Sequence, residues 1–221
     1  MIMMKDPVKT FLKEAELEQI ESCVREAERT TRAEIVVMVA PASHGYPMAG
    51  LLGSAAISVP ASVALTRTVG PLVWAGPHDL WVFLGILFPL FFLCREVVMR
   101  LPRLKRFFVS EKEMDFEVRE AARIHFFSKG LHRTREETGI LIYLSVFEGK
   151  AWVLGDRGVN AAMPPGFWQE VVDQVVVGVK ADRPTAAICA AVGRIRGVLG
   201  EKFPAAPSDM NELQNLMVDA Q

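Results

Sequence analysis

Acidic and basic side chains gather around two short apolar runs in the second half of the chain. Glu137 precedes the run Gly139 to Val146, and Asp156 with Arg157 follows the run Ala151 to Gly155. Two carboxylates held close together can bind a divalent cation through oxygen ligands, or serve as general acid and general base. An arginine beside them can hold a phosphate in a bidentate pair. These residue types predict a cation site or a phosphate-directed site.

The two apolar runs must form strands for these residues to meet. The short turn FEGK joins GILIYLSV to AWVLG, which predicts an antiparallel hairpin. The start of its first strand and the end of its second lie at the same edge of a sheet, so we expect Glu137 and Asp156 to be neighbours. Glu34 begins an earlier apolar run, EIVVMVA. It joins them only if that strand lies beside the strand 139–146 and runs parallel to it.

The candidate ligand-binding residues are therefore Arg135, Glu137, Asp156 and Arg157, and the candidate metal ligands are Glu34, Glu137 and Asp156. Calcium, magnesium or manganese would suit such hard oxygen ligands. A solvated rim, in which these acids pair with Arg135 and Arg157, explains the same residues without any ligand. The residues alone leave open whether the chain is an enzyme.

Several function classes lose support because their signatures are missing. The sequence has no G-x-G-x-x-G, no G-x-x-x-x-G-K-[ST], no H-E-x-x-H and no G-x-S-x-G, which argues against nucleotide binding, zinc proteolysis and serine hydrolysis. A formal net charge of -1 over 221 residues argues against a nucleic-acid partner. Cys23, Cys94 and Cys189 are isolated in the sequence, so we expect neither a disulfide nor a zinc site.

Two uncharged apolar stretches lie between Ala49 and Cys94. A membrane span needs about 20 apolar residues, so we predict transmembrane helices at about 49–66 and 80–99. The short segment between them contains several turn-forming residues and predicts a hairpin.

The chain after the second span is basic. Only Glu96 opposes its cations, which are Arg95, Arg100, Arg103, Lys105 and Arg106. The positive-inside rule places such a flank in the cytoplasm. We therefore expect an integral protein of the bacterial inner membrane with its soluble domain in the cytoplasm, and the lipid bilayer and a membrane protein as its partners.

The remaining patterns predict one α/β domain interrupted by the hairpin. Their order is helix, strand, hairpin, helix, strand, strand, helix, helix, which is typical of a small mixed sheet of at least three strands covered by helices. We assign residues 1–47 and 103–204 to this split domain and 48–102 to the inserted hairpin. Residues 205–221 are predicted to be a loose tail or a short docking helix.

Several motifs in this order resemble the TPM domain. They are TRAEIVVMVA, then TREETGILIYLSVFEGKAWVLGDRGVN, then FWQEVVDQVV and the glycine-bearing last helix. Members of this family occur in many bacterial membrane proteins and form an α/β sandwich. The family commonly has an acid followed by Asn-Gly before its second strand, where this chain has Glu137, Thr138 and Gly139, and the chain keeps Asp156 and Gly158.

The resemblance also bears on function. Some TPM proteins are described as phosphatases or divalent-cation binders, and others as assembly or repair factors for membrane complexes. We therefore expect a membrane-anchored TPM interaction module, an accessory or assembly factor for a membrane complex, whose acidic rim is a candidate cation site. The alternatives are a metal-dependent phosphohydrolase and a purely structural membrane anchor.

Overall fold

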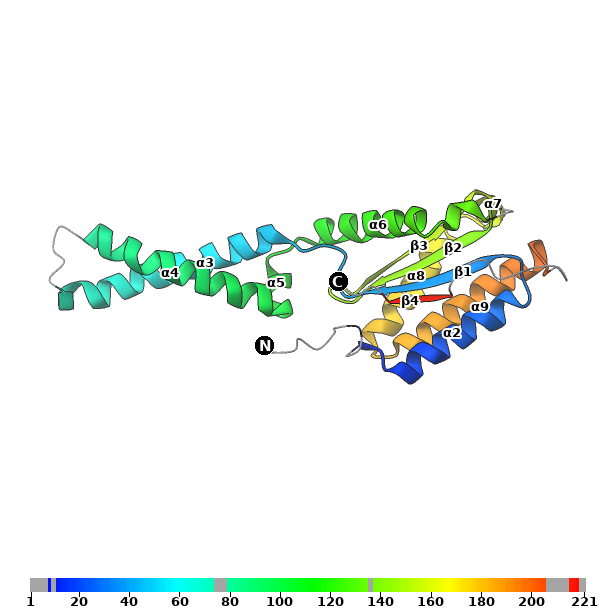
Figure 1. The fold of residues 1–221 in the computed structure, drawn as a ribbon, viewed down its shortest axis with the longest axis horizontal. Coiled ribbons are helices and arrows are strands. Elements are labelled where there is room, and N and C mark those ends of the chain that lie inside the picture. The colour runs from blue at the N-terminus through cyan, green and yellow to red at the C-terminus, as the bar shows by residue number, and fades with distance from the viewer. Residues whose placement is uncertain (1–7, 9–10, 74–78, 135–136, 206–214, 219–221) are drawn as a thin grey trace. The chain divides into compact units, whose positions relative to one another are not determined.

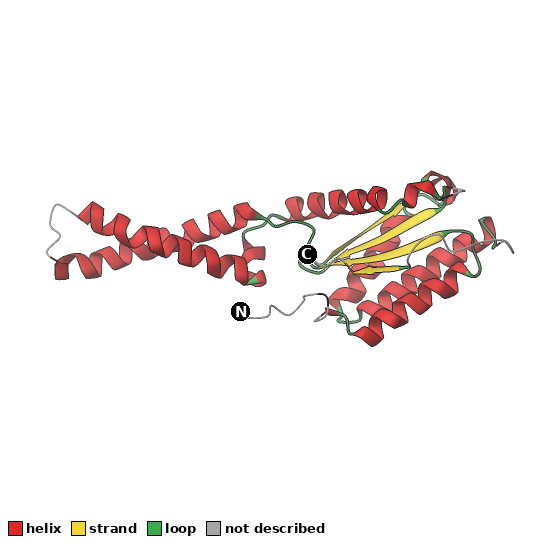
Figure 2. Ribbon diagram, viewed as in Figure 1, coloured by secondary structure: helices red, strands yellow, loops and turns green. Residues whose placement is uncertain are grey.

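The computed structural model describes residues 8, 11–73, 79–134, 137–205 and 215–218 (Figures 1 and 2). The chain forms two compact units, residues 1–44 with 115–221 and residues 45–114. The helices and strands of the described residues are α2 (Glu14–Glu28), β1 (Glu34–Ala40), α3 (Pro47–Val69), η1 (Gly70–Val73), α4 (Asp79–Arg100), α5 (Pro102–Phe107), α6 (Glu111–Ser128), η3 (Leu131–Arg133), β2 (Gly139–Ser145), β3 (Lys150–Gly155), α7 (Arg157–Ala162), α8 (Phe167–Lys180), α9 (Pro184–Lys202) and β4 (Leu216–Val218).

The first unit is built on a four-stranded mixed sheet of order β3-β2-β1-β4. β1 pairs with β2 in parallel, and β2 pairs with β3 antiparallel. Both pairings follow from the chain order, because a tight turn joins β2 to β3 whereas the hairpin and α6 separate β1 from β2. The predicted mixed α/β class is confirmed.

Helices cover both faces of this sheet, as Figure 1 shows: α2, α8 and α9 lie on one face and α6 on the other. Alternate residues of β1 point to opposite faces, which is the period of a strand. Those facing α2, α8 and α9 are Ile35, Val37 and Val39, and those facing α6 are Val36, Met38 and Ala40. Because both faces are buried, the strand is apolar from Ile35 to Ala40.

One segment near the C-terminus differs from the prediction. Residues 216–218, assigned to a loose tail or docking helix, instead form β4, which pairs in parallel with β1. The apolar stretch Leu216 to Val218 is too short for its period to be recognised, and its strand state depends on the free edge of β1.

The prediction of three unpaired cysteines is also wrong. Cys23 of α2 and Cys189 of α9 are joined in a disulfide with their Cα atoms 5.7 Å apart. The two residues are 166 positions apart in the sequence, so only the side-by-side packing of α2 and α9 reveals the pair. Cys94 is a free cysteine.

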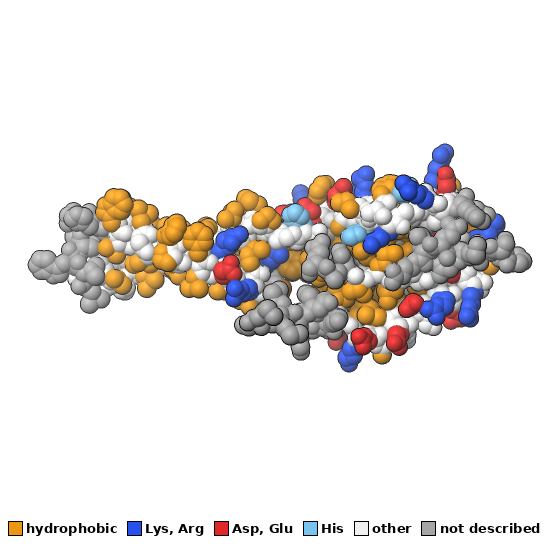
Figure 3. Space-filling model, viewed as in Figure 1, with side chains coloured by type: hydrophobic (Ala, Val, Ile, Leu, Met, Phe, Trp, Pro, Cys, Tyr) orange, Lys and Arg blue, Asp and Glu red, His pale blue; other side chains and the backbone are white. Residues whose placement is uncertain are grey.

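The second unit contains the two long apolar helices, α3 and α4, which form a hairpin. Stretches with mean hydropathies of 1.7 and 2.1 make both helices long and apolar enough to cross a membrane. On the face that Figure 3 shows, many of their side chains are hydrophobic. Small residues of α3 allow close packing inside the unit, since a Cβ at Gly53 would lie 3.0 Å from Val98 of α4.

Candidate functional site

Three acidic residues lie at one edge of the sheet, where β1 and β2 begin and β3 ends. Glu34 is opposite Gly139 in the parallel pair, and Gly155 is opposite Ile140 in the antiparallel pair. Since β1 is adjacent and parallel to β2, the condition for Glu34 to approach the other two acids is met. We call this edge, with Glu34, Glu137, Asp156 and Arg157, the acidic rim.

Backbone hydrogen bonds hold the two loops of the acidic rim together. Asp156 N–H donates to Gly139 O at 2.8 Å, and Gly158 N–H donates to Glu137 O at 3.1 Å. Glu137 has φ of +55°, a left-handed conformation that suits glycine or asparagine better than glutamate. The side chain of Glu137 is exposed. The loops before β2 and after β3 are therefore neighbours, as the hairpin predicted.

The two carboxylate oxygens of Asp156 differ, because only one of them accepts a hydrogen bond within the described part of the chain. It is the N-cap of α7, where its Oδ1 accepts from Arg157 N–H at 2.8 Å. Its Oδ2 is buried and has no hydrogen-bond partner among the described residues. A buried carboxylate oxygen normally has a partner, so Oδ2 is the atom of the acidic rim with the clearest capacity for a ligand.

Gly155, which ends β3, lies in close contact with side chains of α7 and α8. A Cβ at Gly155 would lie 2.9 Å from the indole of Trp168. Asn160 links the same groups, because its Nδ2 donates to Gly155 O at 2.6 Å and its Oδ1 accepts from Trp168 Nε1 at 2.8 Å. The space beside Gly155 is thus filled by Trp168 of α8 and Asn160 of α7.

The cations predicted around the acidic rim are placed only in part. Arg135 lies outside the described residues. Arg157 is exposed. Within the described part of the chain, neither Glu137 nor Asp156 forms an ion pair with Arg157. A purely solvated rim would pair its acids with arginines. No such pair is formed among Glu137, Asp156 and Arg157.

Sequence reasoning missed Glu28, the last residue of α2. Its Oε1 accepts from Ile35 N–H at 3.0 Å, and its Oε2 accepts from Asn215 Nδ2. Burial raises the pKa of this carboxyl to about 7, and the nearby charge of Glu34 adds to the increase, against the lowering effect of the Ile35 hydrogen bond, Asn215 and Arg25. No local signal marks Glu28, because its role depends on β4.

Comparison with known proteins agrees with this architecture. The family model of the TPM domain matches residues 104–198. A TPM domain is thus found at residues 104–198. The matched segment contains β2, β3 and the loops that bring Glu137 and Asp156 together, whereas Glu34 precedes it. The resemblance found in the sequence motifs is confirmed.

A solved structure shares the fold of this chain. The NMR structure of the BA42 protein from the psychrophilic bacterium Bizionia argentinensis superposes with a TM-score of 0.58 at 16% identity, covering 99% of this chain and 100% of that one. At this identity the likeness concerns the fold. Comparison with curated proteins gives no match.

Proposed function

We propose that this chain is a membrane-anchored TPM interaction module that acts as an accessory or assembly factor for a membrane complex. One observation carries the proposal: the chain that contains a TPM domain also contains two helices long and apolar enough to cross a bilayer. Together they would keep the α/β unit at a membrane surface, where a membrane-protein partner would meet it. The basic flank from Arg95 to Arg106 supports a location on the cytoplasmic side of the bacterial inner membrane.

The acidic rim is the surface that we propose for binding, with a divalent cation as its small ligand. Asp156 Oδ2 is buried with no hydrogen-bond partner among the described residues, which fits an oxygen-seeking cation. Asp156 would be its main ligand and Glu137 or Glu34 would supply a second carboxylate, and the cation would supply a fixed positive charge for an acidic or phosphate-bearing partner. In the described ranges no group of three or more His, Cys, Asp or Glu side chains is placed to hold a metal, so the metal-dependent phosphohydrolase stays a prediction of the sequence.

Calorimetry on the detergent-solubilised full chain tests the cation. Calcium, magnesium and manganese are titrated into the wild type and into Asp156→Asn, Glu137→Gln and Glu34→Gln. We expect saturable binding that Asp156→Asn abolishes and the other two weaken. Glu18→Gln, an exposed glutamate of α2, is the matched control and should bind like the wild type. Binding that is indifferent to Asp156→Asn contradicts the cation proposal.

Photocrosslinking tests the interaction module itself. A photoreactive residue is placed at Arg157, at Glu137 or, as the control, at Glu18 of the full chain in its native membranes. We expect one discrete adduct from the two positions on the acidic rim and none from Glu18. The same adduct at all three positions, or no adduct at the acidic rim, contradicts a partner at this surface.

A further inference from the structure

We propose that Cys23 and Cys189 form a reversible, redox-responsive pair that fastens α2 to α9. This inference rests on the cytoplasmic location proposed above. The Cα atoms of the two residues are 5.7 Å apart, within the range for a disulfide. The cytoplasm keeps thiols reduced, and protein disulfides that form there are usually transient and often sense redox conditions. A bond placed in that compartment is therefore expected to open and close.

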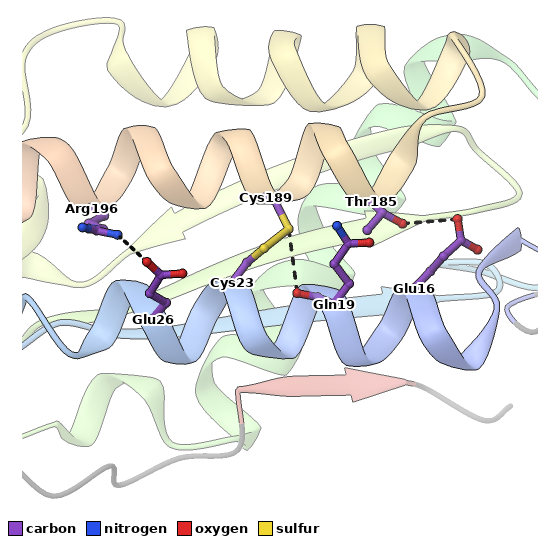
Figure 4. The surroundings of a disulfide bond; sticks show 7 residues. All are labelled: Glu16, Gln19, Cys23, Glu26, Thr185, Cys189 and Arg196. Carbon is purple, nitrogen blue, oxygen red and sulfur yellow. Dashed lines mark hydrogen bonds and ion pairs between the residues drawn. A yellow bond between two sulfur atoms is a disulfide. The ribbon is translucent and has the colours of Figure 1, made fainter.

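Other contacts besides the disulfide hold α2 against α9. Ile20 and Val24 of α2 and Ile188 and Ile195 of α9 are fully buried in one continuous core. Two polar contacts flank the cysteines, as Figure 4 shows: Glu26 lies 3.5 Å from Arg196, and Thr185 Oγ1 lies 3.4 Å from Glu16. Reduced thiols would thus stay close to each other, which favours reformation of the bond.

Both cysteines are half-buried, so small thiols and disulfides can reach the pair. In the reduced state the Cys189 thiol has an acceptor nearby, because its Sγ lies 3.9 Å from the carbonyl oxygen of Gln19. A thiol can donate a weak hydrogen bond to that oxygen. Reduction therefore leaves the Cys189 thiol with a hydrogen-bond acceptor.

The chemistry is thiol–disulfide exchange with a low-molecular-weight disulfide such as glutathione disulfide. The thiolate of one cysteine attacks a sulfur of the oxidant, which forms a mixed disulfide and releases one glutathione thiolate. The second cysteine, as its thiolate, attacks the mixed disulfide and releases the second glutathione. Two protein thiols lose two electrons and two protons in total, and two glutathione thiols form.

The bond would act on the rest of the unit through α2. This helix ends at Glu28, whose carboxylate accepts from Ile35 N–H at the start of β1 and from Asn215 before β4. A covalent link in the middle of α2 opposes separation of the helix from the sheet. Oxidation should therefore restrict local opening of α2 and of the contacts that Glu28 makes.

Glutathione titration of the full-length protein in detergent tests the pair, in a Cys94→Ser background that removes the third cysteine. Thiols are trapped by alkylation and counted by mass spectrometry at each ratio of reduced to oxidised glutathione. We expect Cys23 and Cys189 to convert together in one two-electron transition within the range of glutathione buffers. Reduction should lower the Tm by about 10 °C. Amide exchange should increase mainly in α2.

Cys23→Ser is the matched variant. Its Tm should equal that of the reduced protein and should not change with the ratio of reduced to oxidised glutathione. A bond that resists every glutathione buffer, or never forms, overturns the inference. In cells, alkylation should find the pair reduced during normal growth and oxidised after treatment with a disulfide-forming reagent. Permanent oxidation in cells overturns it too. A topology reporter fused to the C-terminus then separates the causes: a cytoplasmic unit shows that the redox inference alone fails, and an external unit shows that the proposed location fails with it.

Discussion

The two ends of the sheet both carry carboxylates, but they use them differently. At the acidic rim, Glu137 is exposed and Asp156 keeps a buried oxygen with no hydrogen-bond partner among the described residues. At the opposite end, Glu148 is 0% exposed. Its Oε1 accepts from Ser43 N–H at 2.9 Å, and its Oε2 accepts from the Ser145 hydroxyl.

The difference separates a structural acid from a candidate binding acid. A buried carboxylate with both oxygens engaged is satisfied by the protein and has little capacity for a ligand. Glu148 ties the β2–β3 turn to the segment after β1, where Val146 N–H also donates to Ala40 O at 3.0 Å. At the acidic rim, backbone hydrogen bonds tie the two loops together, whereas Asp156 has only its Oδ1 engaged by the residues that the structure describes.

Loss of the Glu148 carboxylate should have the largest effect on stability. Glu148→Ala leaves the Ser43 N–H and the Ser145 hydroxyl without their acceptor, and we expect a loss of about 3 kcal/mol in the free energy of unfolding. Denaturation of the full chain in detergent, followed by circular dichroism, measures it. Glu148→Gln keeps an acceptor for Ser43 and should cost about 1 kcal/mol. Equal losses in the two variants would show that the network does not matter.

Raising the pH should destabilise the unit through Glu28. The folded-state pKa of about 7 exceeds the ordinary value of 4.5, so the folded protein holds the proton more tightly than the unfolded chain does. The contribution of Glu28 to stability is therefore fully present below about pH 4.5 and is lost as the pH rises through about 7. Because Glu28 is half-buried, with Glu34 and Arg25 nearby, we expect a loss of about 1 kcal/mol between about pH 5 and about pH 8.

Thermal denaturation of the wild type and Glu28→Gln across this range isolates the effect of Glu28. The variant cannot ionise at this position, so its stability should depend less on pH than that of the wild type. Glu18→Gln removes an exposed glutamate of the same helix and should keep the dependence of the wild type. Identical pH profiles for the wild type and Glu28→Gln would contradict the raised pKa.

Patterns with a clear period or a tight turn were predictable from the sequence. EIVVMVA was predicted as a strand at residues 34–40, the bounds of β1, and the FEGK turn indicated the antiparallel pairing of β2 with β3. That turn also predicted that the loops carrying Glu137 and Asp156 would meet. Contacts between distant segments were not predictable: the Cys23–Cys189 bond and the Glu28–Asn215 contact depend on how α9 and β4 pack.

Removal of the Asp156 side chain should cost less than removal of Glu148, because only one of its oxygens is engaged. Asp156→Ala deletes the N-cap of α7, and we expect a loss of about 1 kcal/mol in the free energy of unfolding. Asp156→Asn keeps a capping oxygen and should stay within about 0.5 kcal/mol of the wild type. Denaturation in detergent compares the two variants. A loss in Asp156→Ala as large as that in Glu148→Ala would remove the distinction between the two ends of the sheet.

The smallest expected effect is a gain in stability at Glu137. Its φ of +55° disfavours any residue with a Cβ. Glu137→Gly should relieve this strain and, after the greater chain entropy of glycine in the unfolded state, stabilise the protein by about 0.5 kcal/mol. Glu137→Ala removes the same carboxylate but keeps the Cβ, so it should give no gain. If the same glycine variant also binds cation more weakly in calorimetry, then the acidic rim holds a strained residue for its carboxylate, which the satisfied end at Glu148 does not require.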